Sequence, residues 1–179
     1  MTDIQDIPGG YDFFYHVNAT LYLKDRQTGA VIFSKTYDRE DSERYANALH
    51  ICRGNFRSTW FSSGGYEPVA ETLFGGCHVD GFFLEYDSER AGGVEPLRFI
   101  QNQQVVLGLV TSKAPELENE EDVIARIREA AKYVPLDHLC LSPQCGFSST
   151  EEGNLLTEED QWAKLRLIRR IAERVWEDA

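Results

Sequence analysis

The stretch that decides the fold is Gln104-Val105-Val106-Leu107-Gly108-Leu109-Val110-Thr111. Its apolar run is the longest in the chain, and a short run of this kind is typical of a strand that is buried on both faces. Two further strand-like runs lie at residues 79–85 and 137–141, and helix-like segments lie between the runs. Strands that alternate with helices pair in parallel and carry the helices on the outside of the sheet. The sequence therefore predicts an α/β fold.

The helices are predicted from their caps and apolar stripes. Residues 65–74 form one, with Pro68 in its first turn, and a shorter helical stretch covers residues 94–100. Asn119 caps a helix that runs to about residue 133. Thr157 and Asp160 open the last helix as a capping box. The predicted apolar stripe of that helix consists of Trp162, Leu165, Ile168, Ile171, Ala172 and Val175.

The strand–helix units are too few for a closed barrel. About four units can be counted from residue 50 onward, and a TIM-type (β/α)8 barrel has eight units in about 250 residues. We therefore expect a partial (β/α)8 barrel over residues 41–179. Residues 41–49 are predicted to be a helix that leads directly into His50.

Residues 1–40 follow a different pattern. The segments 11–24 and 30–37 alternate in strand fashion around a turn at residues 25–29. This arrangement predicts an N-terminal β-hairpin with antiparallel strands.

Composition and charge restrict the possible partners. The 179 residues carry a formal net charge of −12 with a sequence pI near 4.7, which would repel a nucleic-acid backbone. No apolar run approaches the roughly 18 to 20 residues of a membrane span, and residues 1–10 lack the apolar segment of a signal peptide. We expect a cytoplasmic protein that binds neither nucleic acid nor membrane. Its four cysteines are then expected to be reduced, which favours metal binding over disulfides.

Four residues of the types that bind Zn²⁺ stand out in the sequence, and two of them fall at or near the ends of predicted strands. His50 and Cys52 form a His-x-Cys pair, Glu85 ends the run at 79–85, and Cys145 follows the run at 137–141. Imidazole, carboxylate and thiolate are all zinc ligands, and an α/β barrel builds its active site from residues at the carboxyl ends of its strands. The pattern predicts a zinc site.

In these segments the sequence resembles the cobalamin-independent methionine synthases and their smaller single-barrel relatives. The matching phrases are His50-Ile51-Cys52-Arg53-Gly54-Asn55, Gly81-Phe82-Phe83-Leu84-Glu85-Tyr86-Asp87 and Pro143-Gln144-Cys145-Gly146-Phe147. The resemblance covers roughly residues 50–179, corresponding to the C-terminal half of such a barrel. It implies that His50, Cys52, Glu85 and Cys145 hold the catalytic zinc. It also implies methyl transfer from a methyltetrahydrofolate-type donor to homocysteine, which gives methionine.

The ligand types predict the class of reaction independently of this resemblance. Two thiolates, one carboxylate and Zn²⁺ sum to a formal charge of −1, and such a zinc is a poor Lewis acid for producing hydroxide. An electron-rich zinc can instead deprotonate a substrate thiol and leave its sulfur able to attack carbon. Glu85 is the ligand that the thiol would displace, since the metal prefers sulfur to carboxylate oxygen. The ligands thus predict S-alkylation of a small thiol.

Further residues near the ligands are candidates for substrate contacts. Lys113 stands where methionine synthases carry a histidine that is thought to help protonate the departing folate, and its ammonium could act as an acid, hold an anion or be solvated. Arg53 and Arg57 could attract a substrate carboxylate or pair with surface acids. Trp60 and Phe61 could stack on a pterin, although core packing is favoured for both.

The remaining cysteines, Cys77 and Cys140, are expected to be small buried residues. Cys140 is the alternative partner of Cys145 in a metal site, should His50 be displaced from it.

Three hypotheses of function remain open. The first is a zinc-dependent thiol methyltransferase; since a half-barrel leaves strand edges exposed, it needs a second copy of the chain or a separately encoded first half. The second is a truncated, catalytically inactive remnant that binds zinc or has a structural role. The third is the same thiol chemistry with a different alkyl donor and another small thiol.

Overall fold

The computed structural model describes residues 20–24, 31–36, 47–147 and 151–176. The chain divides into two compact units, residues 1–48 and 49–179. In the first unit, β1 (Thr20–Lys24) and β2 (Val31–Thr36) pair in antiparallel fashion. This pairing confirms the predicted hairpin. Residues 11–19, 30 and 37, which the prediction also assigned to strands, lie outside the described residues.

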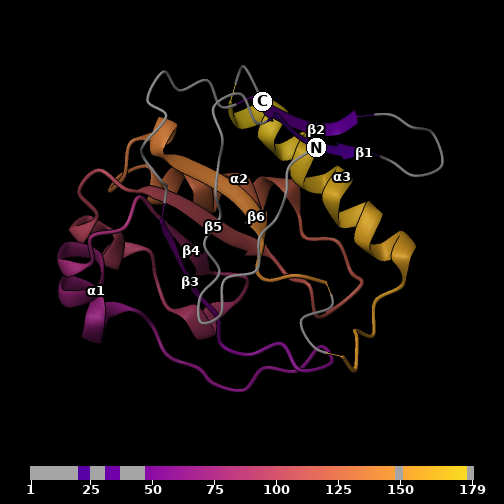
Figure 1. Cartoon of the computed structure of the whole chain (residues 1–179), viewed down its shortest axis with the longest axis horizontal. Helices are drawn as coiled ribbons and strands as arrows, with labels where there is room; N and C mark the ends of the chain where they lie inside the picture. Colours follow the sequence, from indigo (N-terminus) through magenta and orange to yellow (C-terminus); the bar gives the residue numbers. More distant parts are fainter. Residues whose placement is uncertain (1–19, 25–30, 37–46, 148–150, 177–179) are drawn as a thin grey trace. The chain divides into compact units, whose positions relative to one another are not determined.

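A four-stranded sheet follows, with its strands in chain order, β3-β4-β5-β6 (Figure 1). The strands are β3 (Ala48–Ile51), β4 (Gly81–Glu85), β5 (Gln104–Val110) and β6 (Leu139–Pro143). Strand β5 pairs in parallel with both β4 and β6. Parallel strands bring their carboxyl ends to the same edge of a sheet, so this topology confirms the predicted α/β fold and gathers the strand-end residues at one edge.

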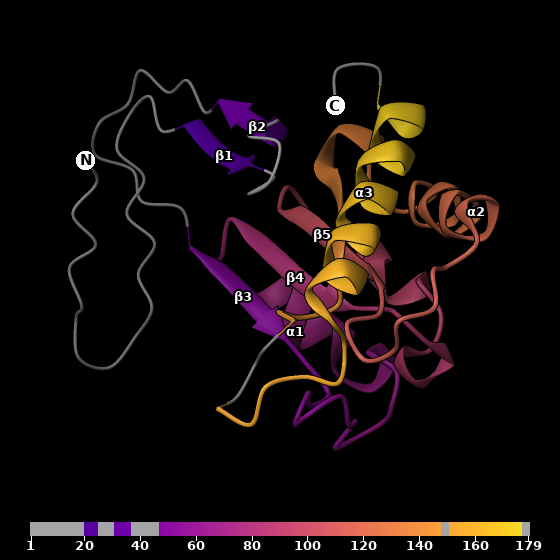
Figure 2. The same cartoon turned by 90° about the vertical axis from the view of Figure 1, so that its right-hand side faces the viewer.

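Helices cover the sheet and fill the connections. The α-helices are α1 (Ala70–Gly76), α2 (Glu120–Ala130) and α3 (Glu158–Val175). Helices α2 and α3 contact each other, and α3 contacts β6 (Figure 2). Short 3₁₀ helices occupy Glu67–Val69, Glu89–Ala91, Glu95–Phe99 and Leu136–His138. Within the described ranges, none of the helices combines the length and apolarity needed to cross a membrane.

The predicted caps of the two long helices are confirmed. The Asn119 side chain accepts hydrogen bonds from the first-turn amides of α2, and Thr157 forms a capping box with Asp160 at the start of α3. The buried face of α3 does not coincide with the predicted apolar stripe. Its fully buried residues are Lys164, Leu167 and Ile171, so the predicted stripe is right at Ile171 and its other members are partly buried.

Several predicted boundaries are wrong; the strand predicted from residue 79, for example, begins at Gly81. Residues 41–49 were predicted to be helical, yet Ala48 and Leu49 belong to β3, because pairing with β4 overrides local helix propensity; residues 41–46 lie outside the described part of the chain. The helix predicted at 65–74 starts as a 3₁₀ turn and continues through Gly76. The last strand begins two residues later than predicted, at Leu139, which pairs with Val105.

A buried lysine holds the end of β5 against α3. The Lys164 ammonium donates to the carbonyl of Glu116 (2.7 Å) and pairs with the Glu118 carboxylate (3.2 Å). Glu118 Oε1 in turn accepts the backbone N–H of Thr111 at 2.7 Å. A fully buried charge needs such partners, and here they fix the backbone directly before Ser112 and Lys113.

Gly108 lets the central strand pass close to its neighbours at the carboxyl edge. A Cβ atom at this position would lie 2.8 Å from Gln144 Cα and 2.9 Å from the Leu84 carbonyl oxygen. Both are backbone atoms of segments that continue to strand-end residues, so they cannot yield as a flexible side chain would. Position 108 must therefore be a glycine for the strands to approach this closely at the carboxyl edge.

Gly108→Ala is expected to destabilise the protein by about 1–3 kcal/mol, because the added methyl group must push the backbone of Gln144 or Leu84 aside. The midpoint of urea unfolding measures this loss. Gly76→Ala is the matched control, since a Cβ at Gly76 meets no atom within 4 Å and should cause no loss. Equal midpoints for the two variants would contradict the prediction.

Candidate metal centre

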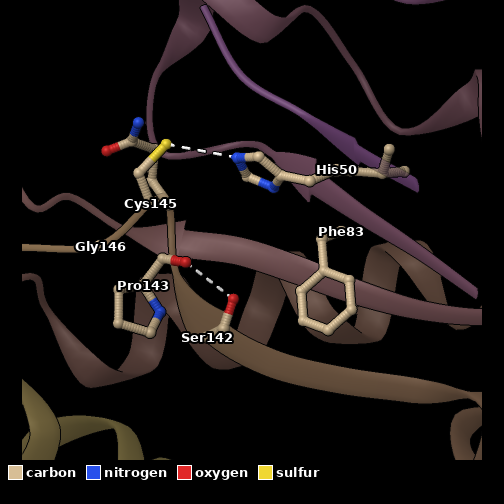
Figure 3. A pocket seen from close by; sticks show the side chains of 8 residues that line it. His50, Phe83, Ser142, Pro143, Cys145 and Gly146 are labelled. Atoms are coloured by element: carbon tan, nitrogen blue, oxygen red, sulfur yellow. Dashed lines mark hydrogen bonds between the residues drawn. The ribbon is translucent and has the colours of Figure 1, made fainter. Parts of the chain in front are cut away.

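Three of the predicted ligands meet at the carboxyl edge of the sheet. His50 lies in β3, Cys52 follows that strand directly, and Cys145 follows β6. One ligand atom from each lies within 4.8 Å of the other two. In Figure 3 the sulfur of Cys145 points toward the imidazole of His50, and the two atoms Cys145 Sγ and His50 Nε2 are 3.5 Å apart. The described residues thus contain a cluster that could hold a metal ion.

The cluster requires a strongly curved sheet. Strands β3 and β6 are the two edges of the sheet, and in a flat sheet they would be about three strand spacings, roughly 14 Å, apart. Two short cysteine side chains cannot span that distance, yet Cys52 Sγ and Cys145 Sγ are 2.9 Å apart. The carboxyl ends of the outer strands must therefore converge, as the wall of a barrel does.

The sulfur atoms of Cys52 and Cys145 lie within hydrogen-bonding distance of each other, at 2.9 Å. Their sulfur atoms are farther apart than the roughly 2.05 Å of a disulfide bond, and both cysteines are free thiols. The hydrogen bond with Cys145 holds the pKa of Cys52 well below its ordinary value, and the same contact, together with burial, raises the pKa of Cys145. One thiol is thus easily deprotonated while the other resists, which leaves a negative charge that attracts a cation.

Glu85 ends β4 beside this cluster but outside the group of three. Its carboxylate is fully buried. Oxygen Oε2 accepts the backbone N–H of Arg53 (2.7 Å) and the side-chain amide of Gln144 (3.2 Å). Oxygen Oε1 is buried without a hydrogen-bond partner among the described residues. Burial raises the pKa of Glu85, although the Arg53 amide and the charge of Lys113 oppose the rise.

The donor set fits a zinc ion. A buried carboxylate oxygen with no partner is costly unless a cation or donor satisfies it, and Glu85 Oε1 is such an atom. The other oxygen of this carboxylate accepts from the Gln144 amide, whose nitrogen lies 3.9 Å from Cys52 Sγ. Two thiolates, one imidazole and one carboxylate are the ligand types of four-coordinate zinc sites. The residues predicted from the sequence therefore remain a coherent ligand set.

The two arginines after the His-x-Cys pair lie in different surroundings. The Arg53 side chain is buried, and its guanidinium donates to the carbonyls of Gly64 (2.7 Å) and Glu85 (3.1 Å) and to the Tyr66 hydroxyl (3.0 Å). Arg53 thus supports Glu85 through both its backbone and its side chain. Arg57 is exposed and has a positive φ of 43°, an uncommon backbone conformation for an arginine. A substrate contact by either residue stays a prediction.

Lys113 follows β5 and is buried at the carboxyl edge of the sheet. The residue is 5 % exposed, and its ammonium has no hydrogen-bond partner in the described part of the chain. The ammonium lies 5.1 Å from the centre of the Trp60 ring, so the indole face stabilises its charge. Phe61, for which core packing was favoured, is 93 % exposed; that preference is wrong, because the loop turns Phe61 away from the hydrophobic core.

The site also contains polar residues that the sequence did not single out. Gln144 links to Glu85, Ser112 donates to Gln144 Oε1 at 2.8 Å, and Asn55 donates to Ser112 Oγ at 3.2 Å. All of these are buried. A buried polar residue needs partners, so the signal available was a glutamine inside the phrase Pro143-Gln144-Cys145, next to a ligand.

A cavity of about 350 Å³ opens onto the cluster from the inner face of the sheet. His50, Phe83, Ser142 and Cys145 line it (Figure 3). Phe83 is 43 % exposed although it lies in the second strand of the sheet. The inner face thus presents both an aromatic side chain and the ligand cluster.

The other two cysteines lie outside the cluster. Cys77 follows α1 and Cys140 lies in β6, and both are partly buried. The Cys140 thiol donates to Gln104 Oε1 at 3.9 Å. The metal-binding group of the described residues contains His50 in place of Cys140, so Cys140 is not needed to complete it.

Comparison with known proteins relates the chain to a protein family. The chain matches the sequence model of the family described as "Cobalamin-independent synthase, Catalytic domain" over residues 77–174. It is 59 % identical over 157 residues to the protein YxjH of Bacillus subtilis, a match that covers 85 % of this chain and 42 % of that protein. The chain thus spans less than half the length of this curated relative.

Two solved structures share the fold. A protein of Listeria monocytogenes assigned as a vitamin-B12-independent methionine synthase is 39 % identical, with a TM-score of 0.52 over 76 % of this chain and 37 % of that chain. A B12-independent methionine synthase of Shewanella sp. W3-18-1, solved in complex with selenomethionine, is 24 % identical, with a TM-score of 0.60 over 77 % and 40 % of the two chains. The second likeness bears on the fold alone.

Protein purified without added metal is expected to contain about one zinc per chain, and Cys145→Ser to contain little, because the variant loses one of two thiolates. Plasma emission spectrometry measures the metal content. Cys140→Ser is the matched control and should keep its zinc, since Cys140 lies outside the cluster. Equal zinc content in the two variants would contradict the assignment of Cys145.

Glu85→Gln is expected to stabilise the metal-free protein increasingly as the pH rises. The raised pKa of Glu85 means that the folded state holds this proton more tightly than the unfolded state. The resulting stabilisation is complete below the unfolded-state pKa and is lost as the pH rises through the folded-state pKa. The neutral glutamine does not suffer this loss.

The measurement is the Tm of metal-free wild type and variant from about pH 4 to about pH 8. The difference, variant minus wild type, should grow across this range. Glu71→Gln, at an exposed site in α1, is the control and should show no such trend. A difference for Glu85→Gln that stays constant or shrinks would show that burial does not raise the pKa of this carboxyl.

Proposed function

The chain belongs to the catalytic-domain family of cobalamin-independent synthases, and we propose that it transfers a methyl group to the sulfur of homocysteine or another small thiol. The methyl donor we propose is of the methyltetrahydrofolate type, and the product with homocysteine is methionine. The observation that carries the proposal is the convergence of His50, Cys52 and Cys145 within 4.8 Å, and the buried, unpartnered oxygen of Glu85 supports it.

The proposed roles follow from the positions of the residues. His50, Cys52, Cys145 and Glu85 would hold Zn²⁺. When bound, this ion supplies the acidity that removes the proton of a thiol near neutral pH. Glu85 would be the ligand that gives way to an incoming sulfur, because a thiolate is a softer ligand than a carboxylate oxygen. The cavity of about 350 Å³ beside His50 and Cys145 offers the approach for a small thiol.

The transfer balances as a displacement. A sulfur–carbon bond forms while the bond between the methyl carbon and the donor nitrogen breaks, the thiol loses its proton, and the donor nitrogen gains one. Lys113 is the residue we assign to supply that proton or to hold an anionic group of the donor. The support is its buried ammonium, which has no hydrogen-bond partner within the described residues.

The exposed inner face points to an assembly. Phe83 and the cavity lie on the concave side of the sheet, where a closed barrel would place further strands. We propose that a second copy of this chain or a completing half-barrel covers this face and contributes substrate contacts. The apolar Phe83 side chain is suited to such a contact, since its burial removes apolar surface from water.

The test is methionine formation from homocysteine and methyltetrahydrofolate, with zinc content and assembly size measured on the same sample. Wild type is expected to be active in an assembly larger than the monomer by mass photometry. Lys113→Met should lower kcat about 10²-fold at unchanged zinc content. Lys132→Met, at an exposed site, is the matched control and should keep full activity.

Two outcomes would contradict parts of the proposal. A folded, zinc-loaded protein that methylates neither homocysteine nor other small thiols would favour a non-catalytic zinc-binding role. Full activity in a monomer would contradict the proposed assembly but not the chemistry.

A further inference from the structure

A buried chain of hydrogen bonds crosses the carboxyl edge of the sheet and ends on Glu85. The Asn55 amide donates to Ser112 Oγ (3.2 Å), the Ser112 hydroxyl donates to Gln144 Oε1 (2.8 Å), and the Gln144 amide donates to Glu85 Oε2 (3.2 Å). The four residues follow or end β3, β5, β6 and β4, respectively. Gln144 is 2 % exposed, so it has no access to alternative partners in water.

The charge of Glu85 fixes the direction of every bond in this chain. A carboxylate accepts and cannot donate, so the NH₂ group of Gln144 must face it and the carbonyl oxygen of Gln144 must face Ser112. The Ser112 hydroxyl then has to donate its proton to Gln144 and can accept from Asn55. The second proton of the Asn55 amide is used as well, since it goes to the Gly146 carbonyl at 3.0 Å.

The backbone of Gln144 is equally fixed. Its N–H donates to the Val110 carbonyl at 2.8 Å, which continues the pairing of β5 and β6 beyond the last residue of β6. Its Cα lies against Gly108, where a Cβ would approach to 2.8 Å. The side-chain amide of Gln144 is therefore held at one place, between Glu85 Oε2 and Cys52 Sγ, which is 3.9 Å from its nitrogen.

The two oxygens of Glu85 become unequal as a result. Oε2 receives N–H groups from Arg53 and Gln144, which draw electron density from it and hold it in place. Oε1 receives none from the described residues. For a cation bound at this site, Oε1 would thus be the strongly donating oxygen. Oε2 is already occupied by the two N–H groups.

We propose that Gln144 is a positioning residue that restricts Glu85 to one coordinating oxygen and thereby keeps this carboxylate replaceable by a substrate thiol. The proposal rests on the thiol-transfer function proposed above. A carboxylate that binds a metal through both oxygens must release both before a sulfur can take its place, whereas one held through Oε1 releases one. Gln144 would thus set how readily the site exchanges a ligand, in addition to its geometry.

The experiment uses the Co²⁺-loaded chain of 179 residues and compares wild type with Gln144→Met, which keeps the length of the side chain and loses the N–H donor. In the variant, Oε2 keeps the Arg53 amide alone and becomes available to the metal. Metal affinity, measured by competition with a chromophoric chelator, is expected to stay within about tenfold of wild type. The visible absorption of Co²⁺ should weaken, as it does when four-coordinate cobalt gains a fifth ligand, and the affinity for homocysteine should fall about tenfold.

A merely structural role predicts a different pattern. Loss of a residue that only orients a ligand typically lowers metal affinity 10–100-fold, and the thiol affinity of the remaining loaded protein would be unchanged. That pattern in Gln144→Met would overturn the proposal. Gln101→Met, at an exposed glutamine, is the matched control and should change none of these quantities.

Ser112→Ala provides a second, smaller perturbation in case Gln144→Met does not fold. It removes the hydroxyl that holds Gln144 Oε1, so it should shift the cobalt spectrum and the thiol affinity in the same directions by a smaller factor. Unchanged thiol affinity in Ser112→Ala would count against the proposal. Failure of wild type to bind Co²⁺ or thiol would overturn the proposed function itself. If wild type binds both normally and the variants lose metal affinity without any change in thiol affinity, this inference alone would be overturned.

Discussion

The carboxyl edge of this sheet is organised around the cost of burying the carboxylate of Glu85. An ionised carboxylate removed from water needs hydrogen bonds or a nearby cation. Glu85 obtains an N–H from the backbone of Arg53 and another from Gln144, and the charge of Lys113 stabilises its ionised form. Each of these groups is itself held by further contacts. The carboxylate therefore dictates the placement of the loop after β3 and of the segments after β5 and β6.

The curvature of the sheet is the second requirement, and it acts together with the first. The sulfurs of Cys52 and Cys145 come from the two outer strands, and their 2.9 Å separation is reached because the carboxyl ends converge. Gly108 permits the convergence, since a side chain there would meet the backbone of Gln144. The Lys164–Glu118 pair then holds the Thr111 amide. This contact fixes the end of β5, so that the next residue, Ser112, can hydrogen-bond to Gln144. A close thiol pair and a buried carboxylate thus depend on backbone contacts several residues away.

The sequence predicted the parts of this arrangement that follow from pattern and order. The apolar runs predicted the inner strands, and ligand-type residues at strand ends predicted a shared edge, since parallel strands direct their carboxyl ends to one side. The helix predicted to lead into His50 was wrong at Ala48 and Leu49, because a four-residue strand gives little periodic signal and is formed by pairing with β4. The link from Asn55 through Ser112 to Gln144 could not be predicted, since it depends on how far the sheet curves. The same holds for Arg53, whose side chain turns to Gly64 and Tyr66.

The polar groups left without partners are concentrated where function is expected. Glu85 Oε1, Lys113 Nζ, the Trp60 indole N–H and both carboxylate oxygens of Asp87 are buried and lack hydrogen-bond partners within the described ranges. Native proteins leave few such atoms, and these five belong to residues at or after the ends of β4 and β5, or to the loop that follows β3. His138 Nδ1, which is also buried without a partner in the described ranges, lies instead before β6. The adjacent residues Arg57 and Ser58 in that loop both have positive φ values, a further local cost. A fold selected for stability alone would pair or replace these groups, so their number at the carboxyl edge is consistent with the cation and substrate that we propose to bind there.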